Sequence, residues 1–139
     1  MVVATLHLEI PAAYAYLQII GTCIASLLQN ESSLPEKETV PYNVELALHE
    51  ACTNIIEHAY AGVPGQIKMT FTLVEKPKKL IVELFDNGRS FDFPSIQKPD
   101  LDEPQIRGYG LFLMQELMDQ VEYWPGAEGN SWKMIKKLG

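Results

Sequence analysis

The apolar residues between positions 44 and 59 recur three or four positions apart, the spacing of a buried stripe along an α-helix. The stripe consists of Val44, Ala47, Leu48, Ala51, Cys52, Ile55, Ile56 and Ala59. Pro41 stands where such a helix can begin, and Gly62, Pro64 and Gly65 follow where it ends. The pattern predicts one long helix that packs against a core.

Two polar residues, Glu50 and Asn54, interrupt this stripe. Because they are four positions apart, a helix places their side chains one above the other on a single face. A carboxylate in this position suits a general base, and an amide oxygen one turn away suits a hard cation such as Mg²⁺. The ordinary alternative is a solvent-facing glutamate next to an asparagine that makes a structural hydrogen bond. The pair is therefore a candidate for half of a site.

Alternation of apolar and polar residues predicts strands in other parts of the chain. Residues 67–73 and 80–85 are separated by a turn at residues 75–79, and together they predict a hairpin in the middle of a sheet. Three further strands are predicted at residues 2–10, 121–124 and 132–138.

Two more helices are indicated by apolar stripes. The first is expected from Pro11 to about Asn30, and the other starts at Leu111. The first stripe contains Tyr14, Leu17, Ile20, Ile24, Leu27 and Leu28, and the second contains Leu111, Phe112, Met114, Leu117 and Met118. Residues 91–108 have no clear periodicity and are too many for an ordinary connection, so we expect this segment to be either functional or disordered.

The composition is that of a soluble globular protein. A chain of 139 residues, 47% of them hydrophobic, is long enough for one domain, residues 1–139, with a sizeable core. No apolar run approaches the length of a membrane span, and the N-terminus lacks the features of a secretory signal, so we expect a cytoplasmic protein. A net charge of −7 argues against binding to nucleic acid. Cys23 and Cys52 are expected to be core residues rather than a disulfide or a metal pair.

Two further polar clusters follow predicted elements. Asp86, Asn87 and Gly88 come directly after a strand, although this is also an ordinary turn sequence. Gly108 and Gly110 precede the helix that starts at Leu111. Glycines at this place allow close approach of the backbone, and free amide groups at the positive end of a helix favour an anion.

The three clusters, in this order, resemble the N, G1 and G2 boxes of the GHKL (histidine kinase-like) ATPases. The resemblance is closest to the RsbW/SpoIIAB-type anti-sigma factor serine/threonine kinases. It is carried by ELALHEACTNIIEHAY, IVELFDNGRSFD, RGYGLFLM and EGNSWKMIKKL. The family implies an α/β two-layer sandwich, the Bergerat fold, in which a mixed, mainly antiparallel sheet carries helices on one face. ATP lies between the helices and a lid, which here corresponds to about residues 93–107.

The resemblance also implies roles for residues of the first two clusters. Glu50 would be the general base and Asn54 the Mg²⁺ ligand. Asp86 would accept a hydrogen bond from the adenine amino group, because a carboxylate accepts and this group donates. Gly88 would let the base lie against the backbone. Many members of the superfamily have a second glycine in this box, and Ser90 occupies its position here.

The remaining roles concern the phosphates and the last strand. Gly108 and Gly110 would bring backbone amides to the phosphates, and Arg107 would add positive charge. Ser131 would lie near the adenine, at a position where threonine is common.

The function implied is ATP-dependent phosphorylation of a serine on a STAS-type anti-anti-sigma partner, together with inhibition of a sigma factor by the unphosphorylated kinase. The family also suggests a homodimer formed through the first strand and helix. Three alternatives remain open. One is a nucleotide-gated binding module without phosphoryl transfer, another is the catalytic fragment of a histidine kinase, and the third is a domain of the same branch in a different signalling circuit.

Overall fold

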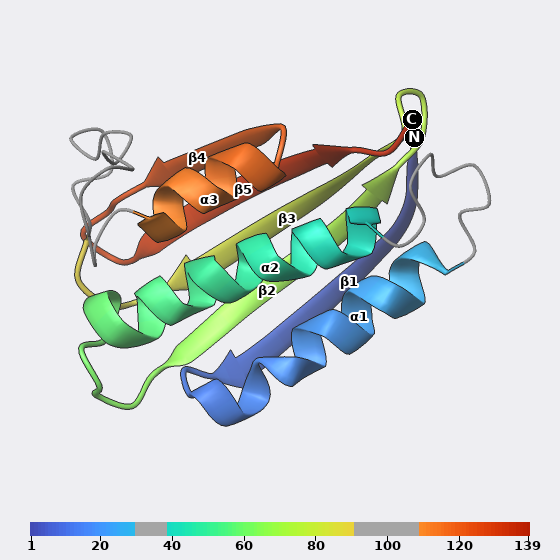
Figure 1. The fold of residues 1–139 in the computed structure, drawn as a ribbon. Coiled ribbons are helices and arrows are strands. Elements are labelled where there is room, and N and C mark those ends of the chain that lie inside the picture. The colour runs from blue at the N-terminus through green and yellow to red at the C-terminus, as the bar shows by residue number, and fades with distance from the viewer. Residues whose placement is uncertain (30–38, 91–108) are drawn as a thin grey trace.

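The protein consists of two layers, a five-stranded sheet and helices that cover one of its faces (Figure 1). The computed structural model describes residues 1–29, 39–90 and 109–139, and for Tyr109 the backbone alone. The strands are β1 (Val2–Pro11), β2 (Gln66–Val74), β3 (Lys79–Asp86), β4 (Gln120–Trp124) and β5 (Asn130–Lys137). The helices are η1 (Tyr14–Tyr16), α1 (Gln18–Leu28), α2 (Thr39–Asn54), η2 (Ile55–Ala59) and α3 (Tyr109–Leu117). This is the predicted α/β sandwich.

The strand order is β1-β2-β3-β5-β4, with the predicted β2–β3 hairpin at the centre. All four pairings between the described strands are antiparallel, so the mixed sheet that we expected is a purely antiparallel one in this part of the chain. Short turns join β2 to β3 and β4 to β5, and because such turns connect antiparallel strands only, they account for two of these pairings. Insertion of β5 between β3 and β4 places Asn130 opposite Asp86.

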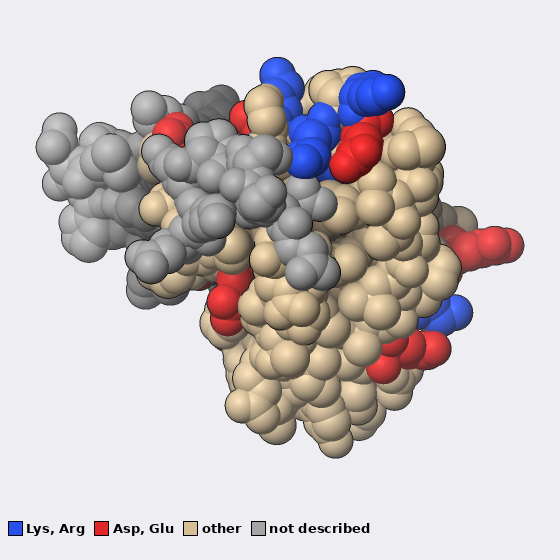
Figure 2. Space-filling model, turned by 90° about the vertical axis from the view of Figure 1, so that its right-hand side faces the viewer, with Lys and Arg blue, Asp and Glu red and all other residues tan. Residues whose placement is uncertain are grey.

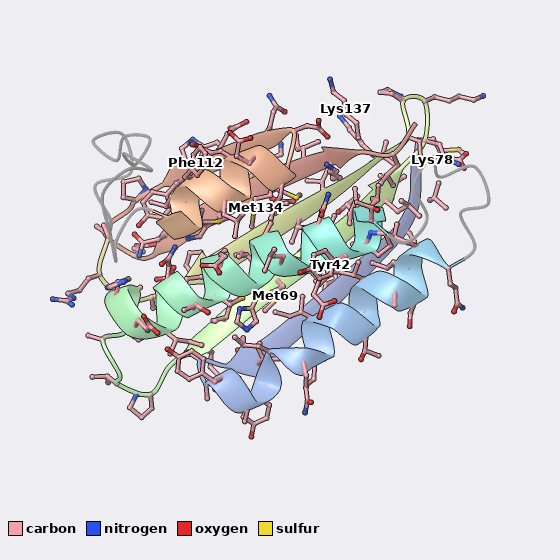
Figure 3. All side chains as sticks on the ribbon, in the orientation of Figure 1. Tyr42, Met69, Lys78, Phe112, Met134 and Lys137 are labelled. Carbon is pink, nitrogen blue, oxygen red and sulfur yellow. The ribbon has the colours of Figure 1, made fainter. Side chains whose placement is uncertain are left out.

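The core lies between the sheet and the helices. Every second residue of the central strands points to the helices and is buried, as in Phe71 and Leu84. All eight apolar residues of the predicted stripe on residues 44–59 are buried, so this prediction is confirmed. Met69 and Met134 lie between the two layers (Figure 3). The core fixes the position of α2, which carries the first polar cluster.

The predicted start of the first helix at Pro11 is wrong. β1 continues through Pro11, which lies opposite Gln66, and the N–H of Ala12 donates to the carbonyl oxygen of Gly65 at 2.8 Å. Proline is tolerated here because β1 is an edge strand and Pro11 is its last residue. A turn of 3-10 helix precedes α1, while Ile20, Ile24 and Leu28 are buried as predicted.

One end of the sandwich holds the ends of β3 and α2 together with the start of α3, and the two chain termini lie at the opposite end (Figure 1). Basic side chains gather at the rim of the face that contains the termini (Figure 2), and Lys78 and Lys137 belong to this end (Figure 3). The first end therefore lies far from this group of lysines. None of the helices in the described ranges is both long and apolar enough to cross a membrane.

Candidate active site

Glu50 and Asn54 converge on Gly110, the second residue of α3. A Cβ atom at Gly110 would lie 2.8 Å from Oε2 of Glu50 and 3.5 Å from Nδ2 of Asn54. Both side chains are half-buried on the last turns of α2. The structure thus brings together three residues that lie up to 60 positions apart in the sequence. Because α3 begins here, the positive end of its dipole points to the same place.

The predicted long helix changes its geometry after Asn54. Residues Ile55–Ala59 form a π-helix, η2, in which the N–H of Tyr60 donates to the carbonyl oxygen of Ile55 at 2.9 Å. The sequence pattern did not predict this wider turn, because the apolar spacing stays helical throughout. Such π-turns are common at functional sites. Here η2 leaves the carbonyl oxygen of Ala59 to accept a hydrogen bond from the N–H of Arg89 at 2.7 Å.

Asp86 is the last residue of β3, and it is 1% exposed. Its Oδ1 accepts two hydrogen bonds, one from the N–H of Gly88 at 2.9 Å and one from Nδ2 of Asn130 at 3.0 Å. Its Oδ2 is buried and has no hydrogen-bond partner among the described residues. Burial raises the pKa of the Asp86 carboxyl, while the two hydrogen bonds act in the opposite direction. Oδ2 is therefore an acceptor available to a donor that enters this site.

Gly88 lies directly against the end of η2. A Cβ atom at this position would lie 2.5 Å from both the carbonyl carbon and the carbonyl oxygen of Ala59. These are backbone atoms, which cannot rotate away as a side chain could. The hydroxyl of Tyr60 reinforces the junction, because it donates to the carbonyl oxygen of Gln66 at 2.6 Å and accepts from the N–H of Asn87 at 3.0 Å. The turn after β3 is thus held in position by the end of η2.

Asn130 is a site residue that the sequence analysis missed. Its side chain is fully buried and donates to Asp86. The sequence analysis expected Ser131 near the adenine, but side chains alternate along a strand, so Ser131 points to the face of the sheet opposite to Asn130 and lies between Phe85 and Trp124 in register. The signal was present in the alternation itself, because Asn130 has the same parity as the buried Trp132 and Met134.

The other predicted residues of the site fall outside the described ranges. These are Arg107, Gly108 and the predicted lid, residues 93–107. The two described clusters are connected by α2 and η2, along which Glu50 and Ala59 lie nine positions apart. The α-helical part from Glu50 to Asn54 alone spans about 6 Å at roughly 1.5 Å per residue. This separation gives the site two ends, one at Asp86 and one at Gly110.

A comparison with protein families decides what this arrangement belongs to. The family model described as the histidine kinase-like ATPase domain matches residues 10–136. The chain belongs to the histidine kinase-like ATPase family. The residues of the two clusters, Glu50, Asn54, Asp86, Gly88 and Gly110, all lie within the matched range.

Within this family, the chain is similar to serine-protein kinases named RsbW. The RsbW of Bacillus thuringiensis strain Al Hakam is 32% identical over 125 residues, which cover 84% of this chain and 75% of that protein. The RsbW of Bacillus cereus strain G9842 is 33% identical with the same coverage. The resemblance to the RsbW-type kinases is therefore confirmed.

Solved structures of histidine kinase-like ATPases share the fold. The structure of the RsbU and RsbW domains of Rv1364c from Mycobacterium tuberculosis has a TM-score of 0.70 at 17% identity. The match covers 98% of this chain, which spans only 33% of that longer chain. The histidine kinase domain of a blue-light-activated kinase from Erythrobacter litoralis has a TM-score of 0.57 at 18% identity, with 89% of this chain and 60% of that one covered. At these identities the likeness shows the fold alone.

Proposed function

We propose that the protein is an ATP-dependent serine/threonine kinase that phosphorylates a serine of a STAS-domain partner and acts as an anti-sigma factor in a partner-switching circuit. The observation that carries the proposal is the convergence of Glu50 and Asn54 on Gly110 at the start of α3. This convergence sets a carboxylate beside the positive end of a helix, and it supports a base and an anion-binding element at one place.

Asp86 would bind the adenine base. Its Oδ2 is buried, lacks a partner among the described residues and can accept a hydrogen bond from the amino group of adenine. A buried acceptor without a partner is unfavourable in the free protein, and a ligand that donates to it removes this penalty. Gly88 would support the base indirectly, because its N–H donates to Oδ1 of Asp86 at 2.9 Å.

Gly110 and the N-terminal amides of α3 would bind phosphate oxygens, together with Gly108 and Arg107. A protein of net charge −7 needs local positive charge for a triphosphate, and the positive end of a helix supplies part of it. Asn54 has a side-chain oxygen suited to Mg²⁺, and the ion, when bound, would neutralise phosphate charge. Since one amide oxygen is a small share of six ligands, phosphates and water would provide the others.

Glu50 would act on the substrate hydroxyl. In phosphoryl transfer the protein mainly positions the reactants and stabilises charge, and a carboxylate orients the attacking hydroxyl or takes its proton. Glu50 is half-buried and lies next to Gly110, which supports a place for its carboxylate at the phosphate end of the proposed site. The carboxylate of Glu50, as the proton acceptor, would therefore lie where the terminal phosphate and the partner's serine meet.

The nature of the partner is supported by the names of the relatives, which are serine-protein kinases. By family resemblance the substrate would be a STAS-type anti-anti-sigma factor and the inhibited client a sigma factor, so that the kinase regulates transcription. A homodimer and a cytoplasmic location are further parts of the proposal.

The alternative function is a nucleotide-gated binding module, in which ATP orders a partner surface without transfer. The presence of Glu50 beside Gly110 favours the kinase, because a gate that only binds nucleotide needs no base. A domain of the same branch in another signalling circuit would have the same chemistry and differ only in its client.

The experiment that separates these functions is incubation with γ-labelled ATP, Mg²⁺ and a candidate STAS-domain protein, with Asn54→Ala as the control. Label on a serine of the partner that is lost in Asn54→Ala would establish the kinase. Measurable Mg-ATP binding without label on any of a panel of STAS partners would overturn the kinase proposal in favour of the binding module.

A further inference from the structure

We infer that Asn130 and Ser90 are positioning residues for the nucleotide, because together they fix the Asp86 carboxylate with Oδ2 directed at the base. This inference rests on the proposed role of Asp86 and adds to it a mechanism and two residues. The two residues, which we call the Asn130–Ser90 pair, lie 40 positions apart in the chain and meet through their side chains.

The amide of Asn130 is held from all sides. Its Nδ2 lies 3.0 Å from Oδ1 of Asp86, 3.0 Å from the carbonyl oxygen of Gly88 and 3.2 Å from the carbonyl oxygen of Arg89. Its Oδ1 accepts a hydrogen bond from the hydroxyl of Ser90 at 2.7 Å. Three acceptors on one side and a donor on the other define which atom is nitrogen. The amide therefore cannot flip without the loss of its hydrogen bonds.

This fixed amide determines the orientation of the Asp86 carboxylate. Oδ1 of Asp86 receives the N–H of Gly88 and Nδ2 of Asn130, whereas Oδ2 has no partner among the described residues. Two donors on the same oxygen fix the rotation of the carboxylate, and they also favour its ionised form at a buried position. Oδ2 is then an acceptor in a set direction, as a donor group on the base requires.

Ser90 completes the pair at a position where many superfamily members have glycine. A glycine has no hydroxyl, so Oδ1 of the fully buried Asn130 would lose the donor that it has here. The serine thus compensates for an asparagine at the start of β5. Among the described residues, the hydrogen bond of Ser90 to Asn130 is its link to Asp86, so the two residues are expected to be energetically coupled.

The test compares ATP with purine ribonucleoside triphosphate, which lacks the 6-amino group that would donate to Asp86. For the wild type we expect ATP to bind about 10- to 100-fold more tightly than this analogue, since the lost hydrogen bond is to a charged group. Asn130→Ala should weaken ATP binding by about 10-fold and change binding of the analogue by less than about twofold. In a kinase assay the same variant should raise the KM for ATP and leave kcat unchanged.

Stability is controlled with Leu80→Ala, a core substitution at the far end of β3 that does not touch Asp86. This variant loses stability but should keep the preference for ATP over the analogue. If Asn130→Ala weakens both ligands equally, or neither, Asn130 is only a part of the scaffold and the inference is overturned.

Ser90→Ala provides the second variant, because Ser90 is exposed and its substitution leaves the core intact. Ser90→Ala alone should weaken ATP binding by about threefold relative to wild type. The same substitution added to Asn130→Ala should have no further effect. Additive effects would overturn the coupling.

Equal binding of both ligands by the wild type would overturn the role of Asp86 and this inference together. Loss of phosphoryl transfer with the ATP preference intact would overturn the kinase alone, and the inference about the pair would stand.

Discussion

The carboxylate of Glu50 lies against the backbone of Gly110, and a Cβ atom at position 110 would be 2.8 Å from its Oε2. Real Cβ contacts do not come this close, so any side chain at position 110 displaces this carboxylate. The two residues belong to α2 and α3, whose relative position is fixed by the buried core between them. The glycine therefore sets the place of the proposed base as well as the space for phosphate.

Gly110→Ala should lower the rate of phosphoryl transfer by about 10- to 100-fold, because a displacement of about 1 Å at a reacting group has effects of this size. The stability of the protein should not fall, since alanine is favoured over glycine in a helix by up to about 1 kcal/mol. The measurements are single-turnover transfer and thermal unfolding. Gln115→Ala, on the exposed side of α3, is the matched control. An unchanged rate of transfer in Gly110→Ala would mean that the contact between Gly110 and Glu50 has no role in catalysis.

Glu50→Ala and Glu50→Gln should abolish transfer while ATP still binds. The loss of a general base typically lowers the rate by about 10²- to 10⁴-fold, and the glutamine variant preserves the shape of the side chain. Transfer and ATP affinity are measured on the same preparations. Glu57→Gln removes an exposed carboxylate from η2 and should leave both unchanged. Loss of ATP binding together with transfer would assign Glu50 to binding rather than to catalysis.

Asp86→Asn should raise stability at neutral pH and abolish recognition of ATP. Burial raises the pKa of Asp86 in the folded state, so the folded protein loses stability as the pH rises from the unfolded pKa, about 3.9, through this raised value. Asparagine at position 86 does not ionise, so the variant does not lose stability in this way. The variant should therefore unfold at higher denaturant concentration than wild type at pH 7, and the difference should shrink as the pH approaches about 4.

The same substitution, Asp86→Asn, should raise stability but lower the affinity for ATP. The N–H of Gly88 and Nδ2 of Asn130 both donate to the position of Oδ1, so an amide introduced at position 86 would place its oxygen there and its NH₂ toward the base. Two donors would then face each other, and ATP affinity should fall by about 100-fold or more. A stabilised variant with wild-type affinity would contradict the role of Asp86.

The sequence predicted the parts of the fold that depend on periodicity. The stripe on residues 44–59, the central hairpin and the two closing strands are all present. The start of the first helix was misplaced because Pro11 is acceptable both as a first helical residue and at the end of an edge strand. Only the pairing with Gln66 in the folded sheet decides between these two states.

The candidate site was predicted as separate clusters, and what the sequence could not provide were contacts between distant segments. The approach of Gly110 to Glu50 depends on how α3 packs on α2. The choice of Ser131 instead of Asn130 is a different case, since the two residues differ only in which face of β5 they occupy and the alternation with Trp132 and Met134 indicates Asn130. The register that sets Asn130 opposite Asp86 is a property of the whole sheet.

Gly88→Ala should destabilise the protein by about 1–3 kcal/mol, the usual effect of forcing atoms into a filled space. The added Cβ would lie 2.5 Å from backbone atoms of Ala59, and the hydrogen bond from the N–H of Arg89 to the Ala59 carbonyl would have to lengthen. Urea unfolding measures the change. Asn87→Ala is the control, because this neighbouring side chain is exposed, and its effect should stay within about 0.5 kcal/mol.

ATP binding should also weaken in Gly88→Ala, since the N–H of Gly88 is one of the two donors that hold Oδ1 of Asp86. A shift of the turn away from η2 would move this donor and rotate the carboxylate that the base is proposed to meet. The loss of affinity should therefore exceed that of a core variant such as Leu80→Ala, even if both lose the same free energy of unfolding. Equal affinities in the two variants would mean that the contact between Gly88 and Ala59 supports the fold and not the orientation of Asp86.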